Sequence, residues 1–201
     1  GSLTALYFDK IYTRGDLTAA IATDGVYTRK GTAIGSLTAA SVRDVSLNAP
    51  AGGIGKITVT DWLNTDAVAD EITAAWIGKL TVKGVRGVAG SGDFEANLTL
   101  SNLGVAEGKT ALGSAAIAGT LGRSGGNVTV HGNTGKVWVG AVRGLVTIDG
   151  DARSVTIGEA MELAPAAGGA VGELHVGGSA PVAANRQRFD LSDSSIYANN
   201  P

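Results

Sequence analysis

One short phrase recurs along most of this chain: an apolar residue, a glycine, any residue, and then an apolar–threonine–apolar triplet. The clearest copies read IGSLTA, IGKITV and IGKLTV, and weaker copies follow further along the chain. When the copies are aligned on the apolar residue before the threonine position, they recur about every 20 residues, which is the period of a solenoid repeat. A repeat of this length favours folds in which similar units stack on one another.

The triplet within the phrase alternates like a half-buried strand. Apolar residues occupy both of its outer positions, and threonine stands between them in six of nine copies. The aligned apolar residues are Leu17, Leu37, Ile57, Leu80, Leu98, Ala115, Val137, Val155 and Leu174. A period of two with β-branched residues on the outer side indicates a β-strand. Further apolar residues follow most copies seven to nine positions later, which indicates at least two strands in each repeat.

Glycine precedes the aligned apolar residue by two positions in seven of the nine copies. These glycines are Gly15, Gly35, Gly55, Gly78, Gly113, Gly135 and Gly172. The chain of 201 residues contains 31 glycines, about twice the usual share, and only 4 prolines. Because glycine tolerates both a positive φ and the close approach of another backbone, we expect a corner before each strand.

Short strands, corner glycines and this period together predict an all-β fold, a right-handed parallel β-helix. The prediction places about eight to nine coils of roughly 20 residues in one domain, residues 1–184. Residues 185–201 are polar and break the phrase, so we expect a C-terminal cap or linker there. The strand edges at the ends of such a rod would permit end-to-end or edge-mediated association.

Other repeat folds fit less well. A β-sandwich does not require one phrase at one period, and the pattern of leucine-rich repeats is missing. A left-handed hexapeptide helix needs a strict six-residue period, whereas the spacing here varies from 17 to 23 residues and favours the looser right-handed helix.

Charge and composition narrow the range of partners. The chain has 16 basic and 18 acidic residues, a net charge of −2, and no run of five basic residues, so we expect no nucleic-acid partner. It has no cysteine and no run of 18 apolar residues, which excludes a disulfide scaffold and a membrane-spanning helix. No signal peptide is visible, so we expect a leader to have been trimmed or to lie upstream.

Motifs for metals and cofactors are also missing. Residues 52–60 come closest to a calcium-binding nonapeptide, but Ile57 stands where the aspartate should be. The acidic turn at 149–151 offers one carboxylate pair, fewer than the six to eight oxygens that calcium takes. His131 and His175 lie about two coils apart and lack a third ligand for zinc. We therefore expect no metal and no cofactor.

Some right-handed β-helices are enzymes, among them pectin lyases and polygalacturonases. The chain contains one Asn-Thr-Asp sequence at 64–66, as polygalacturonases do, but it lacks their Asp-Asp pair and their Arg-Ile-Lys sequence. Glycoside hydrolysis requires two carboxyl groups across the scissile bond. The candidates for a carbohydrate-active enzyme are Asp66, Asp70 and Glu71, and the alternative is a solvated loop between coils.

The outward positions of the repeat suggest a binding face. Stacked threonines at a spacing of about 4.8 Å would form a flat, regular surface of hydroxyl and methyl groups. Its candidate residues are Thr38, Thr58, Thr81, Thr99 and Trp138. Such a face could bind ice, or a glycan whose sugar ring packs on the tryptophan. The alternative, which the sequence favours, is that threonine stands there simply as a good exposed strand residue.

The phrase resembles the Gly/Ala/Thr-rich β-helix repeats of large bacterial proteins that are secreted or anchored to the cell surface. The resemblance covers roughly residues 15–180. It implies an extracellular or cell-surface location and the role of an adhesin-like or stalk-like structural rod without catalysis. A polysaccharide or another cell-surface component is the partner that this role implies.

Overall fold

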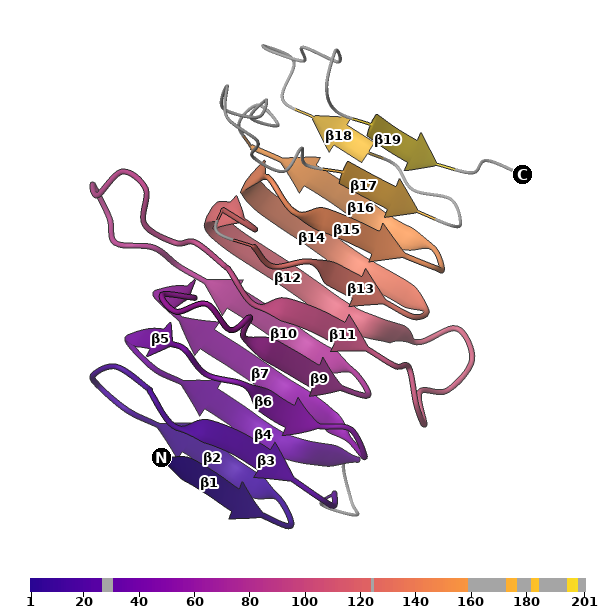
Figure 1. Cartoon of the computed structure of the whole chain (residues 1–201). Coiled ribbons are helices and arrows are strands. Elements are labelled where there is room, and N and C mark those ends of the chain that lie inside the picture. The colour runs from indigo at the N-terminus through magenta and orange to yellow at the C-terminus, as the bar shows by residue number, and fades with distance from the viewer. Residues whose placement is uncertain (27–30, 124, 159–172, 177–181, 185–194, 199–201) are drawn as a thin grey trace.

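A computed structural model of the chain describes residues 1–26, 31–123, 125–158, 173–176, 182–184 and 195–198. Every regular element in these ranges is a β-strand, and strands that pair run parallel. Figure 1 shows the strands stacked one above another from the N-terminal end to the C-terminal end. The predicted all-β fold built from parallel, stacked coils is confirmed: the chain is a parallel β-solenoid.

Two long sheets form its main walls. Sheet A contains, in order, β1 (Ser2–Ala5), β3 (Ala20–Thr23), β6 (Leu47–Ala49), β9 (Glu71–Ala74), β11 (Asn97–Leu100), β13 (Val128–Val130), β15 (Leu145–Ile148), β17 (Glu173–Val176) and β19 (Ser195–Ala198). Sheet B contains β2 (Phe8–Tyr12), β4 (Thr32–Thr38), β7 (Gly53–Val59), β10 (Ile77–Val82), β12 (Thr110–Leu121), β14 (Asn133–Val142), β16 (Ala152–Ile157) and β18 (Val182–Ala184). Because strands of the two sheets alternate along the chain, each turn adds one strand to each wall.

A third side of the coil is built from shorter pairings. β5 (Ser41–Arg43) and β8 (Asp61–Leu63) form a two-stranded sheet, and isolated bridges extend the same row in both directions. The row consists of Leu17, Val42, Trp62, Phe94, Leu121 and Val142, all of them buried. Trp62 and Phe94 meet edge to face with their ring centroids 6.0 Å apart. The solenoid therefore encloses its core on three sides, in agreement with the prediction of at least two strands per repeat.

The register separates the aligned apolar residues into different ladders. Six of them stack in sheet B, namely Leu37, Ile57, Leu80, Ala115, Val137 and Val155. Leu98 and Leu174 instead lie in sheet A, and Leu17 belongs to the third side. The alignment did not separate these three from the rest, because strands of both sheets read apolar–threonine–apolar and look alike in the sequence.

The repeated glycines form a column inside the strands of sheet B. Along β7, Ile54 and Ile57 are both buried although three positions separate them, so the strand must bend at Gly55 and Lys56. A side chain on Gly78 would place its Cβ 2.6 Å from the carbonyl oxygen of Gly55 on the previous turn. The same conflict recurs along the column, at Gly35, Gly55, Gly113 and Gly135. Close backbone approach explains the glycines, and none in this column has a positive φ.

The two remaining glycines of the predicted set differ from the column. Gly15 lies outside the strands and has open space around it. Gly172 lies outside the described residues. So does most of the polar segment 185–201, of which only β19 is described, as a strand paired with β17. That pairing extends sheet A beyond residue 184.

Candidate functional site

The structure places the three carboxyl groups of the enzyme hypothesis in three different surroundings. Asp66 lies on an exposed loop, where its Oδ1 accepts a hydrogen bond from the Val68 amide at 2.8 Å. Asp70 is only 3% exposed, and its Oδ2 accepts a hydrogen bond from Trp62 Nε1 at 3.0 Å. Glu71 is exposed on sheet A, and its Oε1 accepts a hydrogen bond from Asn97 Nδ2 at 2.8 Å. This arrangement gives the enzyme hypothesis no support.

Two aspartates near the third side titrate in opposite directions. Burial raises the pKa of Asp70 above its usual value, and the hydrogen bonds from the Val45 amide and the Trp62 indole offset this only in part. The pKa of Asp44 is lowered, chiefly by the hydroxyl and the amide of Thr65, which donate to its two carboxylate oxygens at 2.6 Å each. The charges of Asp44 and Asp66 raise the pKa of Asp70 further, so these three carboxyl groups act on one another.

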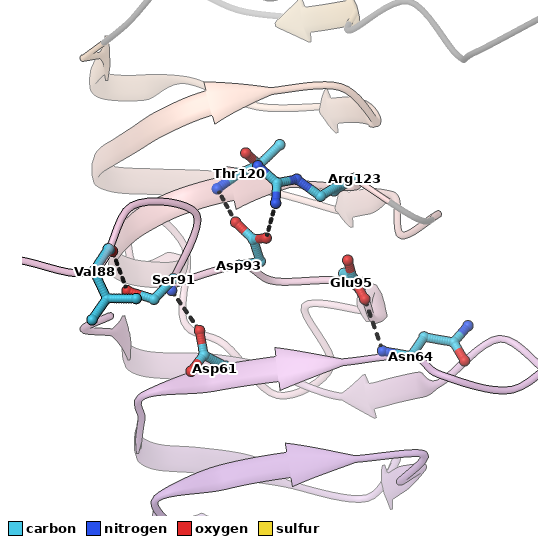
Figure 2. A network of polar contacts seen from close by, with 9 residues as sticks. Asp61, Asn64, Val88, Ser91, Asp93, Glu95, Thr120 and Arg123 are labelled. Atoms are coloured by element: carbon cyan, nitrogen blue, oxygen red, sulfur yellow. Dashed lines mark hydrogen bonds and ion pairs between the residues drawn. The ribbon is translucent and has the colours of Figure 1, made fainter. Parts of the chain in front are cut away.

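A network of carboxylates fastens the long loops to the third side (Figure 2). Asp61 Oδ1 accepts a hydrogen bond from the Gly92 amide at 2.5 Å, and Glu95 Oε2 accepts one from the Asn64 amide at 3.0 Å. Asp61 and Glu95 each reach a segment 31 positions away in the sequence. Their role is to satisfy backbone donors in loops that have no strand partner of their own.

Asp93 is the most enclosed member of this network. It is 3% exposed, and its Oδ1 accepts a hydrogen bond from the Thr120 amide at 2.7 Å. Its Oδ2 forms an ion pair with Arg123 Nη1 at 3.2 Å, as Figure 2 shows. The Arg123 side chain is 41% exposed, so water screens one side of this pair.

A groove of about 290 Å³ opens beside Asp93. Its walls are the loop at 88–91 and small residues of β12 and β14, and Asp93 and Arg123 are its charged groups. Since these two groups are already paired with each other, the groove offers no free carboxylate for acid–base chemistry. The loop at 88–91 thus forms one wall of a groove whose two charged groups are paired with each other.

The predicted threonine face is divided between the two sheets. Thr38, Thr58, Thr81 and Trp138 occupy one outward row of sheet B, with Ala116 between the last two. Thr99 lies in sheet A instead.

An unbroken threonine row is found in sheet A, where sequence analysis identified only one member. Thr73, Thr99, Thr129 and Thr147 are register partners on four successive turns. The full phrase did not find the others: β9 lacks its glycine, and the glycines before β13 and β15, Gly126 and Gly144, are not preceded by an apolar residue. The triplet apolar–threonine–apolar alone would have found them.

A second row was missed on sheet B because its position was treated as variable. The residue between the glycine and the aligned apolar residue is lysine in three copies of the phrase. The register stacks Lys56 directly on Lys79, and Lys136 lies two turns further on. All three side chains are exposed.

Possible metal ligands do not gather in the described part of the chain, where no three His, Cys, Asp or Glu side chains lie together. His131 Nδ1 contacts Asp149 Oδ2 at 2.5 Å, and both side chains are half exposed. His175 occupies the register position opposite Thr147 in sheet A. The described residues contain no helix that could cross a membrane.

Comparison with known proteins finds no matching family model, no matching curated protein and no matching solved structure. The fold assignment therefore rests on the strand pairing of this chain alone. The resemblance to repeats of bacterial surface proteins stays a prediction.

Proposed function

We propose that this chain is a rod segment of a secreted or cell-surface protein and serves a structural or interaction role, like a stalk or an adhesin. The observation that supports the proposal is one uninterrupted core. A single cluster of buried apolar residues runs from Ile11 to Ile157, through every turn whose side chains are described. Because each turn packs mainly on its neighbours, the fold extends along one axis and presents repeated rows of side chains on its walls.

The polar groups of the described turns fit this role. The carboxylates of Asp61, Asp93 and Glu95 bind backbone amides or a neighbouring arginine and so hold loops in place. The amide side chains of sheet A act in the same way: Asn97 Oδ1 accepts from the Asn127 amide, and Asn127 Oδ1 accepts from the Leu145 amide on the next turn. These groups contribute to stability between turns, as expected of a structural rod.

The location part of the proposal is tested in cells that express the protein. An antibody against this chain should label intact cells, and protease added outside should remove the label without lysis. A cytoplasmic protein probed in parallel should be untouched, which controls for leakage. Labelling that needs permeabilised cells, or that survives external protease, would contradict a surface location.

The unbroken threonine row of sheet A supports a second candidate function, binding of a neutral glycan or of ice. Its four side chains stack at about 4.8 Å and leave no turn without a hydroxyl. The variant Thr99→Lys with Thr129→Lys would place two long, charged side chains in the middle of this row. We expect it to abolish inhibition of ice recrystallisation or retention on insoluble neutral glycan, and an unchanged activity would rule the candidate out.

A further inference from the structure

Charged residues are divided unequally between the two sheets. The strands of sheet B contain four lysines and one arginine against one aspartate, although the whole chain has a net charge of −2. They are Lys10, Lys56, Lys79, Lys136, Arg153 and Asp9. The strands of sheet A contain no lysine or arginine and two glutamates, Glu71 and Glu173. One wall of an acidic protein is therefore cationic.

The register gathers these lysines into one row, the lysine column. From the N-terminal end its members are Lys10, Ser36, Lys56, Lys79, Ser114, Lys136 and Ser154. The residue that follows each member is an apolar residue of the buried core. The column members therefore point outward, and all four lysines are exposed. Six steps of about 4.8 Å separate its first and last members, so the column is roughly 29 Å long along the solenoid axis.

No described carboxylate neutralises the column. None of its lysines forms an ion pair with a described residue, and Lys10 lies over the ring of Tyr12, with its Nζ 5.1 Å from the centroid. Lys56 and Lys79 are direct register partners, and like charges in that position repel each other. A ligand with regularly spaced negative charges along the same axis would relieve this repulsion.

A row of hydroxyl and aromatic groups runs beside the lysine column. Its members are Tyr12, Thr38, Thr58, Thr81, Ala116, Trp138 and Thr156. Trp138 is 42% exposed, so part of its indole surface is available for the apolar face of a sugar ring. The hydroxyl oxygens of Thr58 and Thr81 are buried, so the charge and the ring are the groups of this wall that a ligand can reach. Positive charge and an exposed ring on one wall match a polymer of sugar rings that carries acidic groups.

We propose that the outer wall of sheet B binds a linear anionic polysaccharide along the lysine column. The inference goes beyond the rod function, which does not require any ligand, and it assigns a chemical class to the polysaccharide partner. Nucleic acid fits the wall less well. Single strands bind by stacking successive bases on aromatic rings, whereas Tyr12 and Trp138 stand five turns apart, roughly 24 Å. In the described part of the chain, the outer wall of sheet B also consists of strands paired side by side, with no helix that could enter a groove of duplex DNA.

The test compares binding of the full chain to four probes at low ionic strength: polygalacturonate, heparin, neutral dextran and single-stranded oligo-dT. The column variant is Lys56→Ser with Lys79→Ser. Serine is the native residue at three other positions of the same column, so the variant should fold and should melt at the same or a higher temperature. The control variant, Arg86→Ser with Lys109→Ser, removes the same charge from exposed loops outside the sheet.

We expect wild type and the control variant to bind at least one of the two anionic polysaccharides and not dextran. The column variant should bind about tenfold more weakly, since two surface charge contacts are lost. Affinity of the wild-type chain should also fall as salt is raised, because exposed charges are screened. Trp138→Ala, which matches native Ala116 on the adjacent turn of the same row, provides a second variant and should weaken binding as well.

Several outcomes would overturn the proposal: no binding to either polysaccharide, equal losses in the column and control variants, or affinity independent of salt. Tighter binding to oligo-dT than to both polysaccharides would instead assign the wall to nucleic acid and refute the polysaccharide assignment. These binding measurements use purified protein, whereas the rod proposal is tested by cell location. Failure of one therefore leaves the other intact.

Discussion

At the scale of single residues, buried carboxylates do most to connect the long loops with the solenoid. Asp70 and Asp93 are both 3% exposed, yet their surroundings differ. Asp93 has an arginine partner and a backbone donor, whereas Asp70 receives only N–H groups of neutral residues. Burying a charge without an opposite charge is unfavourable, and the pKa of Asp70 is raised for that reason.

The titration of Asp70 leads to a prediction about acid. Its raised pKa means that the folded state binds the proton more tightly, so Asp70 lowers stability at neutral pH. That loss is recovered as the pH falls through the raised folded pKa towards the ordinary value of 3.8. Asp70→Asn removes the buried charge and keeps one acceptor oxygen for the two N–H groups of Trp62 and Val45, so we expect its stability relative to wild type to be most favourable at pH 7. Its advantage should shrink on acidification, as measured by urea unfolding from pH 7 to pH 3.

Asp44 provides the opposite case and serves as the comparison. Its lowered pKa adds stability above the ordinary value of 3.8, and this stability is lost as the pH falls through the lower folded pKa. Asp44 also has a positive φ of 52°, which asparagine tolerates. Asp44→Asn should therefore be less stable than wild type at pH 7, and the difference should narrow in acid. If acidification changed the stability of both variants relative to wild type in the same direction, the titration argument would be contradicted.

The second prediction at this scale concerns Asp93. Asp93→Ala leaves the buried Thr120 amide without an acceptor, and we expect a loss of about 2 kcal/mol in the free energy of unfolding. Asp93→Asn keeps that acceptor and loses only the charge opposite the partly exposed Arg123, so its loss should be about 1 kcal/mol or less. Urea unfolding at pH 7 measures both values. Equal losses would mean that the ion pair, and not the amide bond, holds this loop.

At the scale of elements, the bend inside each strand of sheet B determines where glycine is required. The glycine column brings the backbones of successive turns so close that a Cβ has no space. This explains why glycine recurs in the phrase at one fixed position, while the residue after it varies between lysine and serine.

We predict different effects on stability when alanine replaces two glycines of the repeated phrase, Gly78 and Gly15. Gly78→Ala would press a methyl group against the Gly55 carbonyl oxygen, a backbone atom that moves only if the turns separate. The expected loss is about 2 kcal/mol in the free energy of unfolding. Gly15→Ala meets nothing within 4 Å, and its stability should be unchanged or slightly raised. Thermal and urea unfolding measure the stability of both variants. Similar effects of the two substitutions would contradict the close backbone approach at the glycines of sheet B.

The sequence predicted the strands themselves well, but it did not predict which of the two sheets each strand joins. Period-two alternation identified the strand around Ile57 and the one around Leu98, yet gave no sign that they belong to different sheets. The ladder of a residue depends on the position of the bend and the length of the loop before it. Loop insertions such as 84–96 change the spacing without breaking the phrase, so spacing alone could not separate the ladders.

At the scale of the whole molecule, the solenoid converts a repeat in sequence into rows on a surface. The lysine column and the threonine row of sheet A are each composed of residues some 20 positions apart in the chain, and only the register brings them together. The candidate residues that the sequence analysis gave for a binding face therefore came from two rows. The right-handed sense and the coil count of the predicted helix stay predictions.

The pairing of residues along the third side could not be predicted from the sequence either, for a different reason. Trp62 and Phe94 pair across the third side although each belongs to a segment without the phrase. Hydrogen bonds that distant amides donate to carboxylates such as Asp61 and Glu95 hold these segments together, and those contacts have no signature in local sequence.

The register of sheet B is the central claim, and disulfide cross-linking tests it most directly. The chain has no cysteine, so Lys56→Cys with Lys79→Cys can form only one intramolecular bond. Register partners on adjacent strands lie about 4.8 Å apart, within the range that a disulfide spans, whereas Lys56 and Ser114 are two turns apart, about 10 Å. Oxidation of the dilute protein should cross-link the first pair nearly completely and leave Lys56→Cys with Ser114→Cys reduced. A failure of the first pair, or equal cross-linking of both, would contradict the account.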